Sequence, residues 1–446
     1  MNVALFSGNY CYTVDGPALA LNRLVPFLER NGHNVLVFSP TSRTPAFEPA
    51  GTLVSTPSLP LPGRSEYRLS LGLTPRLRAR LEAFQPDVFH LATPDPLGLH
   101  ALRLAKKWGV PAIASFHTRF DVYPRYYGLT ILEKYLTNYM RWFYRQCSQV
   151  YVPSRSMEDV LRTQGFGDDI RIWSRGVDAS LFRPGRRDKS WRRSIGIEDD
   201  EVVVVFVGRL VMEKGLEFLA SAMELAEGMG VHYRCVVVGE GPAREWFASR
   251  VPQAHFTGFL RGEELARVYA SSDIFVNPSE TETFGNVTLE AMASGLPAVC
   301  VDAIGSRSLV RHAVTGFLAT PGDATEFARL LSLLVRDDVI RRRFGTAGVV
   351  ASRAYDWEVM MAGLVDGYRG AIREMNATSA MTATNAVKKA RGIPALRPAR
   401  RARSEEPAFA ESTIPEMQHA IVDSYRKANV SHERPAAVAA VSSHRH

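Results

Sequence analysis

The opening of the chain alternates between apolar strand-like runs and an amphipathic helix, and this alternation limits the possible folds more than any other feature. Residues 2–6 have the pattern of a buried strand, and a loop over 7–16 follows it. Residues 17–31 carry apolar side chains at helical spacing, and residues 32–38 form the next apolar strand. A strand, a helix and a strand in this order predict a right-handed, doubly wound α/β domain.

Further strands in the first half end near polar residues. The run 84–91 leads into a predicted helix over 97–108, and a short strand over 109–116 ends at His117. Ligands of open α/β sheets gather at the carboxyl ends of the strands. His117 is therefore a candidate site residue, although a single histidine in such a position is often only structural.

A second strand-to-helix unit begins in the middle of the chain. The apolar run 201–208 is followed by Arg209 and Lys214, and a helix is predicted to start near Leu216. Two cations in such a turn, beside the free amides of a helix N-terminus, suit a pyrophosphate because charge-assisted contacts to phosphate are strong. The pair predicts an anion site, although two surface charges alone would also fit a solvated loop.

One stretch further on combines a strand, a turn-rich loop and a helix with two carboxylates. Glu282 lies on the loop, and Glu290 lies on the helix predicted from Asn286 onward. The amides of Phe284, Gly285 and Asn286 would point out of the helix N-terminus, where unpaired donors and the helix dipole attract anions and hydroxyl groups. This arrangement suits a polyhydroxylated, phosphorylated ligand.

The sequence around these two glutamates is more specific than their spacing. It has the form Ser-x-x-Glu-x-Phe-Gly over 279–285 and continues as Glu-Ala-Met-Ala-Ser-Gly-Leu-Pro over 290–297. This string resembles the signature of the retaining GT-B glycosyltransferases of family 4, and the resemblance covers about residues 1–375. The segment Ser-Arg-Gly-Val-Asp over 174–178, where the family has an Asn-Gly-Val-Asp-like segment, is most similar to the members that form sulfoquinovosyl-diacylglycerol and other glycolipids. The chain also resembles the GDP-mannose-dependent mannosyltransferases.

The resemblance implies an α/β fold of the GT-B type, with two doubly wound Rossmann-like domains facing a cleft. From about residue 376 the composition shifts to Ala, Arg, Ser and Pro and apolar periodicity disappears, which predicts disorder. We expect an acceptor-binding domain over 1–180, a linker over 181–200, a nucleotide-sugar-binding domain over 201–355, a helix over 356–375 that crosses back to the first domain, and a disordered basic tail over 376–446.

The resemblance also implies roles for the candidate residues. Arg209 and Lys214 would neutralise the leaving nucleoside diphosphate, and Glu290 would hold the ribose hydroxyls. Glu282, with the amides that follow it, would orient the sugar, and His117 would lie near that sugar. No residue stands out as a covalent nucleophile, so catalysis is expected to depend on positioning and leaving-group stabilisation, without a cofactor and without a catalytic metal.

Further candidates follow from the same resemblance. Gly16 lies in the first strand-to-helix loop, where a residue without a Cβ atom lets the main chain approach the donor phosphates; the family often has two glycines here. Phe259 and Leu260 occupy the place where similar enzymes hold the nucleotide base. Arg119 and Asp121 are candidates for the acceptor side. The expected donor set is Gly16, Arg209, Lys214, Phe259, Leu260, Glu282, Phe284, Gly285, Asn286 and Glu290.

A dinucleotide-binding interpretation is excluded. Gly239 and Gly241 follow a strand, but position 244 is an arginine where the third glycine of that motif is required. No acidic residue stands out about 20 positions later to bind a ribose. The chain is therefore not expected to use NAD.

The composition limits the possible binding partners of the chain but does not identify one. The formal net charge of +8 favours an anionic partner such as a nucleotide, a membrane surface or nucleic acid. The four cysteines form no Cys-x-x-Cys motif, and no signal peptide opens the chain, so a cytosolic protein without a disulfide framework is expected. No apolar run reaches the ~20 residues that span a bilayer.

The acceptor depends on two basic clusters in the first half. Residues 123–146 mix aromatic and basic side chains, and several arginines lie over 64–80. Such clusters suit a peripheral contact with an anionic membrane, although a core helix with a solvated basic side has the same composition. No RNA-recognition motif accompanies them, so nucleic acid is not expected. We expect a UDP- or GDP-sugar donor and a lipid acceptor such as diacylglycerol; the alternatives are a soluble glycan acceptor and a non-catalytic nucleotide-sugar-binding regulator.

Overall fold

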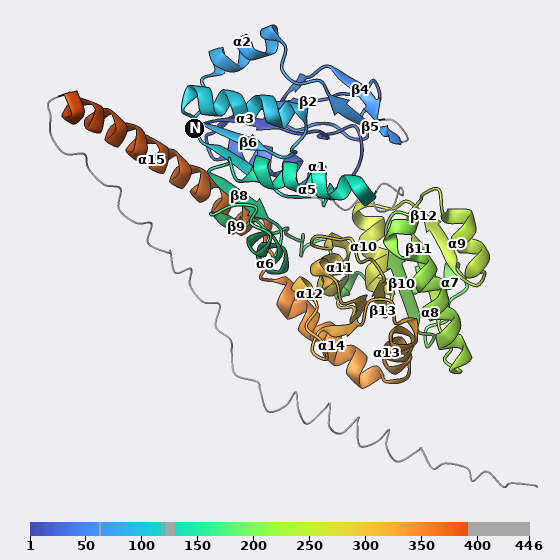
Figure 1. Ribbon diagram of the computed structural model, residues 1–446. Helices are drawn as coiled ribbons and strands as arrows, with labels where there is room; N and C mark the ends of the chain where they lie inside the picture. The colour runs from blue at the N-terminus through green and yellow to red at the C-terminus, as the bar shows by residue number, and fades with distance from the viewer. Residues whose placement is uncertain (62–63, 118, 121–129, 391–446) are drawn as a thin grey trace, which may run out of the picture. The chain divides into compact units, whose positions relative to one another are not determined.

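The computed structural model describes residues 1–61, 64–117, 119–120 and 130–390, and two parallel sheets organise them (Figure 1). The first sheet has seven strands in the order β3-β2-β1-β6-β7-β8-β9. The strand order reverses between β1 and β6, which makes a topological switch point. The strands are β1 (Asn2–Phe6), β2 (Asn34–Ser39), β3 (Thr52–Ser55), β6 (Val88–Leu91), β7 (Ala112–Ser115), β8 (Gln149–Val152) and β9 (Ile170–Ile172).

Helices connect these parallel strands, and their ends carry recognisable caps. The carboxylate of Asp15 accepts a hydrogen bond from the amide of Ala18 at the start of the first helix, and Asp95 does the same for Gly98. The antiparallel hairpin of β4 (Ser58–Leu61) and β5 (Arg64–Ser70) stands apart from the main sheet. The helices are α1 (Gly16–Arg30), α2 (Pro75–Phe84), α3 (Pro96–Trp108), α5 (Thr130–Tyr144) and α6 (Arg155–Thr163).

The second sheet has six parallel strands in the order β12-β11-β10-β13-β14-β15, with its switch point between β10 and β13. The strands are β10 (Val203–Val207), β11 (Arg234–Val238), β12 (His255–Gly258), β13 (Ile274–Asn277), β14 (Ala298–Val301) and β15 (Gly316–Ala319). The helices are η3 (Met212–Lys214), α8 (Leu216–Gly228), α9 (Arg244–Arg250), α10 (Gly262–Ser271), α11 (Asn286–Ala293), α12 (Ile304–Leu309), α13 (Ala324–Arg336) and α14 (Asp338–Ser352).

Both sheets are buried on both faces, which explains why their strands are continuous apolar runs without alternation. In β1, Val3 and Leu5 belong to one core cluster, whereas Ala4 and Phe6 belong to the cluster on the opposite face. The strands of the second sheet likewise divide between two clusters. The predicted class of two doubly wound α/β units is therefore confirmed.

The last described helix, α15 (Trp357–Ala390), returns to the first sheet. Leu364 and Tyr368 lie in the same core cluster as residues of α1 and β1, and the Tyr368 hydroxyl is hydrogen-bonded to Nδ1 of buried His90. The helix continues past residue 376, where the tail was expected to begin, so that expectation is wrong for 376–390. Alanine, threonine and lysine without proline sustain a helix there, and the lost apolar periodicity marks only the end of its packing. Residues 391–446 lie outside the described part.

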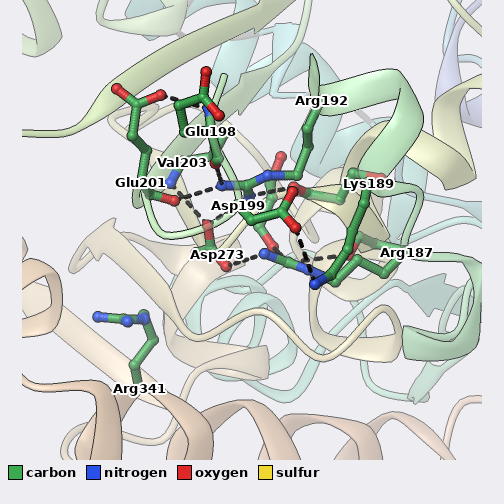
Figure 2. A network of polar contacts seen from close by, with 12 residues as sticks. Arg187, Lys189, Arg192, Glu198, Asp199, Glu201, Val203, Asp273 and Arg341 are labelled. Atoms are coloured by element: carbon green, nitrogen blue, oxygen red, sulfur yellow. Dashed lines mark hydrogen bonds and ion pairs between the residues drawn. The ribbon is translucent and has the colours of Figure 1, made fainter. Parts of the chain in front are cut away.

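The segment expected to be a linker is itself structured. It contains η2 (Pro184–Arg186) and α7 (Lys189–Ser194), and Arg192 from α7 is fully buried. Its guanidinium donates to Asp273 Oδ2 at 3.0 Å and to the carbonyl oxygens of Glu198 and Glu201 (Figure 2). This network ties the segment before β10 to the residue before β13.

Candidate active site

The two loops that leave the switch point of the second sheet carry the predicted cations and carboxylates. The loop after β10 ends at Lys214, and the loop after β13 carries Glu282. Lys214 Nζ lies 2.8 Å from Glu282 Oε1, and both side chains are only partly exposed. Ligands of doubly wound sheets bind at such a point because the neighbouring crossovers diverge there.

The orientation of Glu282 is set by its neighbours. Asn277, the last residue of β13, donates from Nδ2 to Glu282 Oε2 at 3.1 Å and to the hydroxyl of Thr288 at 3.1 Å. Gly285 has φ of +98°, and a Cβ atom there would lie 3.0 Å from Glu282 Oε2. A side chain at position 285 would therefore strain the backbone and crowd the carboxylate.

The N-terminus of α11 lies directly behind this carboxylate. Among the described residues, the amides of Phe284, Gly285 and Asn286 donate to no main-chain acceptor. The Phe284 side chain is buried against Tyr355, which anchors the loop. Free amides at a helix N-terminus suit an anion, and these lie next to the loop that carries Glu282.

Glu290 lies one turn into α11 and is partly buried. Its Oε2 accepts a hydrogen bond from the Tyr269 hydroxyl at 3.3 Å. Burial raises the pKa of Glu290 to about 7, against the opposing effects of Tyr269 and the charge of Arg23. In the absence of a ligand, this carboxyl group titrates near neutral pH.

The described residues of both sheets belong to one compact unit, and several contacts join the first sheet's loops to the second. Arg209 is exposed, and its Nη1 donates to the hydroxyl of Tyr67 at 3.4 Å. A Cβ atom on Gly16 would lie 3.1 Å from Nδ2 of Asn286, so the start of α1 approaches the start of α11 closely. The structure thus brings Gly16 to the loop that carries Glu282.

His117 follows β7 and is buried. Its main-chain oxygen accepts a hydrogen bond from the Thr283 hydroxyl at 2.9 Å, and its Nδ1 lies 2.6 Å from Nη2 of Arg175. Burial lowers the pKa of His117 well below its usual value, and the charges of Arg175 and His90 add to this effect. The histidine is therefore neutral at physiological pH.

The remaining candidates are less closely grouped. Phe259 is 58% exposed, and Leu260 packs partly against a core cluster of the second sheet. The Arg119 side chain is partly buried. Asp121 lies outside the described residues. Within the described part of the chain, no group of three or more His, Cys, Asp or Glu residues is arranged to hold a metal ion.

Three residues that shape this site, Asn277, Thr283 and Arg175, had no role predicted from the sequence. Asn277 and Thr283 lie in the strand–loop–helix stretch that carries Glu282, and this position was the only sign in the sequence that they belong to the site. Arg175 lies in Ser-Arg-Gly-Val-Asp, where the resembled family has an Asn-Gly-Val-Asp-like segment. That departure was the available signal, but its meaning depends on the contact with His117.

Taken together, two Rossmann-like sheets with a phosphate-suited and polyol-suited site at a switch point define the class of GT-B nucleotide-sugar transferases. A family model for Glycosyltransferase Family 4 matches residues 14–181, and one for Glycosyl transferases group 1 matches residues 187–349. The chain belongs to glycosyltransferase family 4, and it is a hexosyltransferase of the GT-B fold.

Named relatives support this assignment. The chain is 34% identical over 353 residues to sulfoquinovosyl transferase SQD2 of Arabidopsis thaliana, covering 77% of this chain and 68% of that protein. It is 32% identical to the GDP-mannose-dependent alpha-mannosyltransferase of Corynebacterium glutamicum, covering 83% and 89%. It is 27% identical to the alpha-monoglucosyldiacylglycerol synthase of Streptococcus pneumoniae, covering 67% and 70%.

Solved structures share the fold. Sucrose-phosphate synthase from Thermosynechococcus elongatus superposes with a TM-score of 0.69 at 21% identity, covering 83% of this chain and 98% of that one. Anabaena HepE in complex with UDP and glucose superposes with a TM-score of 0.63 at 20% identity, covering 82% and 98%. The predicted family and fold are confirmed.

Proposed function

We propose that this chain transfers a hexose, with retention of configuration, from a UDP- or GDP-sugar to a membrane lipid acceptor such as diacylglycerol or a related glycolipid. The observation that carries the proposal is the contact of Lys214 with Glu282 at the switch point, next to the amides of residues 284–286, which donate to no main-chain acceptor of the described residues. A cation, a carboxylate and unpaired amides together suit the diphosphate and the hydroxyl groups of a nucleotide sugar.

In the proposed reaction, the bond between the anomeric carbon and the phosphate oxygen breaks and a bond to the acceptor hydroxyl oxygen forms on the same face. The acceptor proton passes to the leaving phosphate. Arg209 and Lys214 would stabilise the charge that develops on the diphosphate, and Glu290 would accept hydrogen bonds from the ribose. Glu282 would exchange its contact with Lys214 for the sugar hydroxyls.

The lipid acceptor is supported by an exposed apolar surface on α5. Ile131 is 80% exposed and Tyr135 is 68% exposed, while Lys134 on the same helix and Arg145 just after its end are also exposed. Apolar side chains with flanking cations favour contact with an anionic bilayer surface. Among the described residues, no helix is long and apolar enough to cross a bilayer.

The relatives' names fit this acceptor, since one of them is a monoglucosyldiacylglycerol synthase. We propose a peripheral location at the cytoplasmic face of the membrane. The second candidate is mannosyl transfer to a soluble or polysaccharide-intermediate acceptor, which the similarity to a GDP-mannose-dependent enzyme favours.

Turnover of radiolabelled UDP- and GDP-sugars with a membrane lipid extract tests the proposal. Lys214→Ala and Arg209→Ala are expected to lower kcat/KM roughly 10²-fold or more, because each removes a charge from the leaving group. Lys189→Ala is the matched control, since Lys189 is an exposed lysine that pairs with Asp199. Parent-like turnover by both site variants would exclude the assigned roles.

Two further measurements address the partners. Co-sedimentation with phosphatidylglycerol vesicles is expected at low salt and should weaken when Ile131 and Tyr135 are both changed to Ser. Failure to bind at every salt concentration would favour the soluble acceptor. Because Arg209 and Lys214 are assigned the charge-neutralising role, we also propose that EDTA leaves turnover unchanged; a loss restored by Mg²⁺ would contradict this.

A further inference from the structure

Arg175 is a buried cation that no carboxylate of the described residues contacts. Only 4% of it is exposed, its Nη1 donates to the carbonyl oxygen of Trp173 at 3.2 Å, and its guanidinium carbon lies 5.0 Å from the centre of the Trp173 ring. Among the described residues, no carboxylate lies within ion-pair distance of it. Burial lowers the pKa of Arg175 to about 10, so the group is still charged at neutral pH.

Arg192 shows how this chain normally compensates a buried arginine. Its side chain has no exposed surface, yet it reaches Asp273 Oδ2 and three main-chain oxygens (Figure 2). A buried charge is costly unless a counter-charge and hydrogen bonds offset its lost hydration. Arg175 has hydrogen bonds but no counter-charge among the described residues, which suits an anion supplied by a ligand.

The contact with His117 determines where such an anion would bind. A guanidinium has only donors, so Nδ1 of His117 must accept the 2.6 Å hydrogen bond from Arg175 and the ring proton must be on Nε2. This Nε2 atom is buried, and it has no hydrogen-bond partner among the described residues. The other charged or titratable group that acts on the ring is His90, which is itself neutral. His117 therefore presents an unsatisfied N–H that the charge of Arg175 polarises.

The residue that carries this N–H is bonded through its main chain to the loop assigned to the sugar. Thr283, which is hydrogen-bonded to the main-chain oxygen of His117, separates Glu282 from Phe284. The Thr283 carbonyl oxygen also accepts a hydrogen bond from Ser154 at 3.1 Å, so two contacts hold the loop against the first sheet's carboxyl edge. A sugar that contacts Glu282 would therefore bind close to His117.

We propose, resting on the function proposed above, that the transferred sugar carries an anionic substituent and that the His117–Arg175 pair binds it. The shared chemistry is an anionic oxygen, from the carboxylate of a hexuronic acid or the sulfonate of a sulfosugar. His117 Nε2–H donates to that oxygen, and its negative charge compensates Arg175. A neutral hydroxyl would satisfy the histidine but would leave the arginine without a counter-charge.

The test compares matched neutral and acidic donors on the full-length protein. UDP-glucose, UDP-glucuronate and UDP-sulfoquinovose, together with GDP-mannose and GDP-mannuronate, are assayed with one lipid extract. The kcat/KM ratio of the preferred acidic donor to its neutral counterpart is expected to be roughly 10². The two UDP-linked acids distinguish carboxylate from sulfonate. A ratio at or below one on both bases would overturn the proposal.

Arg175→Met is expected to reduce this ratio about 10²-fold while the Kd for UDP or GDP without sugar stays within twofold of the parent. Arg183→Met, an exposed arginine of the next segment, is the control and should keep the ratio. An equal loss with acidic and neutral donors would mean that Arg175 is only structural. If Arg175→Met does not fold, Arg175→Gln replaces it, because glutamine also removes the charge but keeps a hydrogen-bond donor; the parent ratio alone still decides the outcome.

The experiments give a different result if the proposed transferase function itself is wrong. A chain that binds UDP or GDP but turns over no nucleotide sugar would contradict the transferase role. Competition binding then still compares acidic with neutral nucleotide sugars, and tighter binding of the acidic sugar that depends on Arg175 would retain the inference. Equal binding of both would reject it.

Discussion

At the scale of single residues, the site depends on how neighbours set charge and orientation. Asn277 holds one oxygen of Glu282 while Lys214 holds the other, so the carboxylate is oriented before any ligand arrives. Arg175 forces the proton of His117 onto Nε2 in the same way. Preorganised groups of this kind avoid the cost of reorientation when a ligand binds.

Glu290 provides a prediction at this scale. Its pKa of about 7 means that the carboxyl group is mostly protonated below pH 7 and ionised above it. If the ionised form accepts hydrogen bonds from the ribose, nucleotide affinity should fall as pH drops below 7, by up to about tenfold per pH unit. Calorimetric titration with UDP and GDP between pH 5.5 and 8.5 measures this dependence.

Glu290→Gln is the matched control because it keeps the shape of the side chain and leaves the titration of the ligand's own phosphate unchanged. Its affinity should be roughly tenfold or more below that of the parent at pH 8.5, where a charge-assisted hydrogen bond is lost. The gap should close toward pH 5.5. A gap that stays constant across the whole range would show that Glu290 does not bind the nucleotide as a carboxylate.

At the scale of elements, packing rather than propensity decides how much each segment contributes. α15 illustrates this, since Ala371 is buried in the core of the first sheet whereas Ala380, on the same helix, is exposed. Both residues lie in a continuous helix. Among the side chains of this helix that the structure describes, the fully buried apolar ones lie in its first part, and most helical stability in proteins comes from such burial.

Two proline substitutions test this division. Ala371→Pro should lower the free energy of unfolding by about 3 kcal/mol or more, because it removes a helical hydrogen bond inside a packed segment. Ala380→Pro should reduce helical circular dichroism but change the unfolding free energy by less than about 0.5 kcal/mol. Similar losses of stability from both variants would mean that the distal helix is packed against something.

The segment around Arg192 carries a second prediction for elements. Arg192→Met removes the 3.0 Å contact with Asp273 and leaves a carboxylate with Arg187 as its remaining ion-pair partner. Breaking a buried pair in this way costs about 3–5 kcal/mol. Arg193→Met is the matched control, because the neighbouring Arg193 is exposed and a solvent-exposed ion pair contributes little to stability. Equal urea midpoints for the two variants would contradict the assigned role of this network.

At the scale of the whole molecule, the pH dependence of stability is set by buried histidines and buried carboxyl groups, whose pKa shifts have opposite effects. Burial lowers the pKa of His90 to about 3, so the unfolded chain binds more protons than the folded one below the ordinary histidine value. Asp95, with its pKa raised to about 6, and Glu290 act in the opposite direction. These opposite effects partly cancel in the dependence of the unfolding free energy on pH. Comparing the parent with a variant that lacks one of these groups isolates the contribution of that group.

His90→Asn provides that difference. His90 contributes stability above pH 6.5 that is lost as pH falls toward 3, because only the unfolded state takes up the proton. The stability advantage of the parent over His90→Asn should therefore shrink by up to about 1.4 kcal/mol per pH unit below pH 6.5. Urea denaturation at pH 7.5, 6.5 and 5.5 measures it, with exposed His232→Asn as the control. A difference that does not change with pH would contradict a neutral, buried His90.

Much of the fold could be predicted because its determinants are local. The apolar run of β1, the helical spacing of α1 and the turn-rich loop before α11 placed these elements close to their observed bounds. The end of α15 was missed because loss of apolar periodicity was interpreted as loss of helix. The structured linker was missed because its Arg, Pro and Gly content is typical of a loop, and only the contacts of Arg192 show otherwise.

By itself, the sequence determined the alternation of strands and helices, the family and the residue types at each strand end, since these follow from periodicity and short motifs read along the chain. Only the tertiary structure decided which strand ends are neighbours. The contact between Lys214 and Glu282 joins residues 68 positions apart, and it exists because β10 pairs with β13. The contact between Arg175 and His117 likewise depends on the order in which parallel strands assemble, which no local pattern encodes.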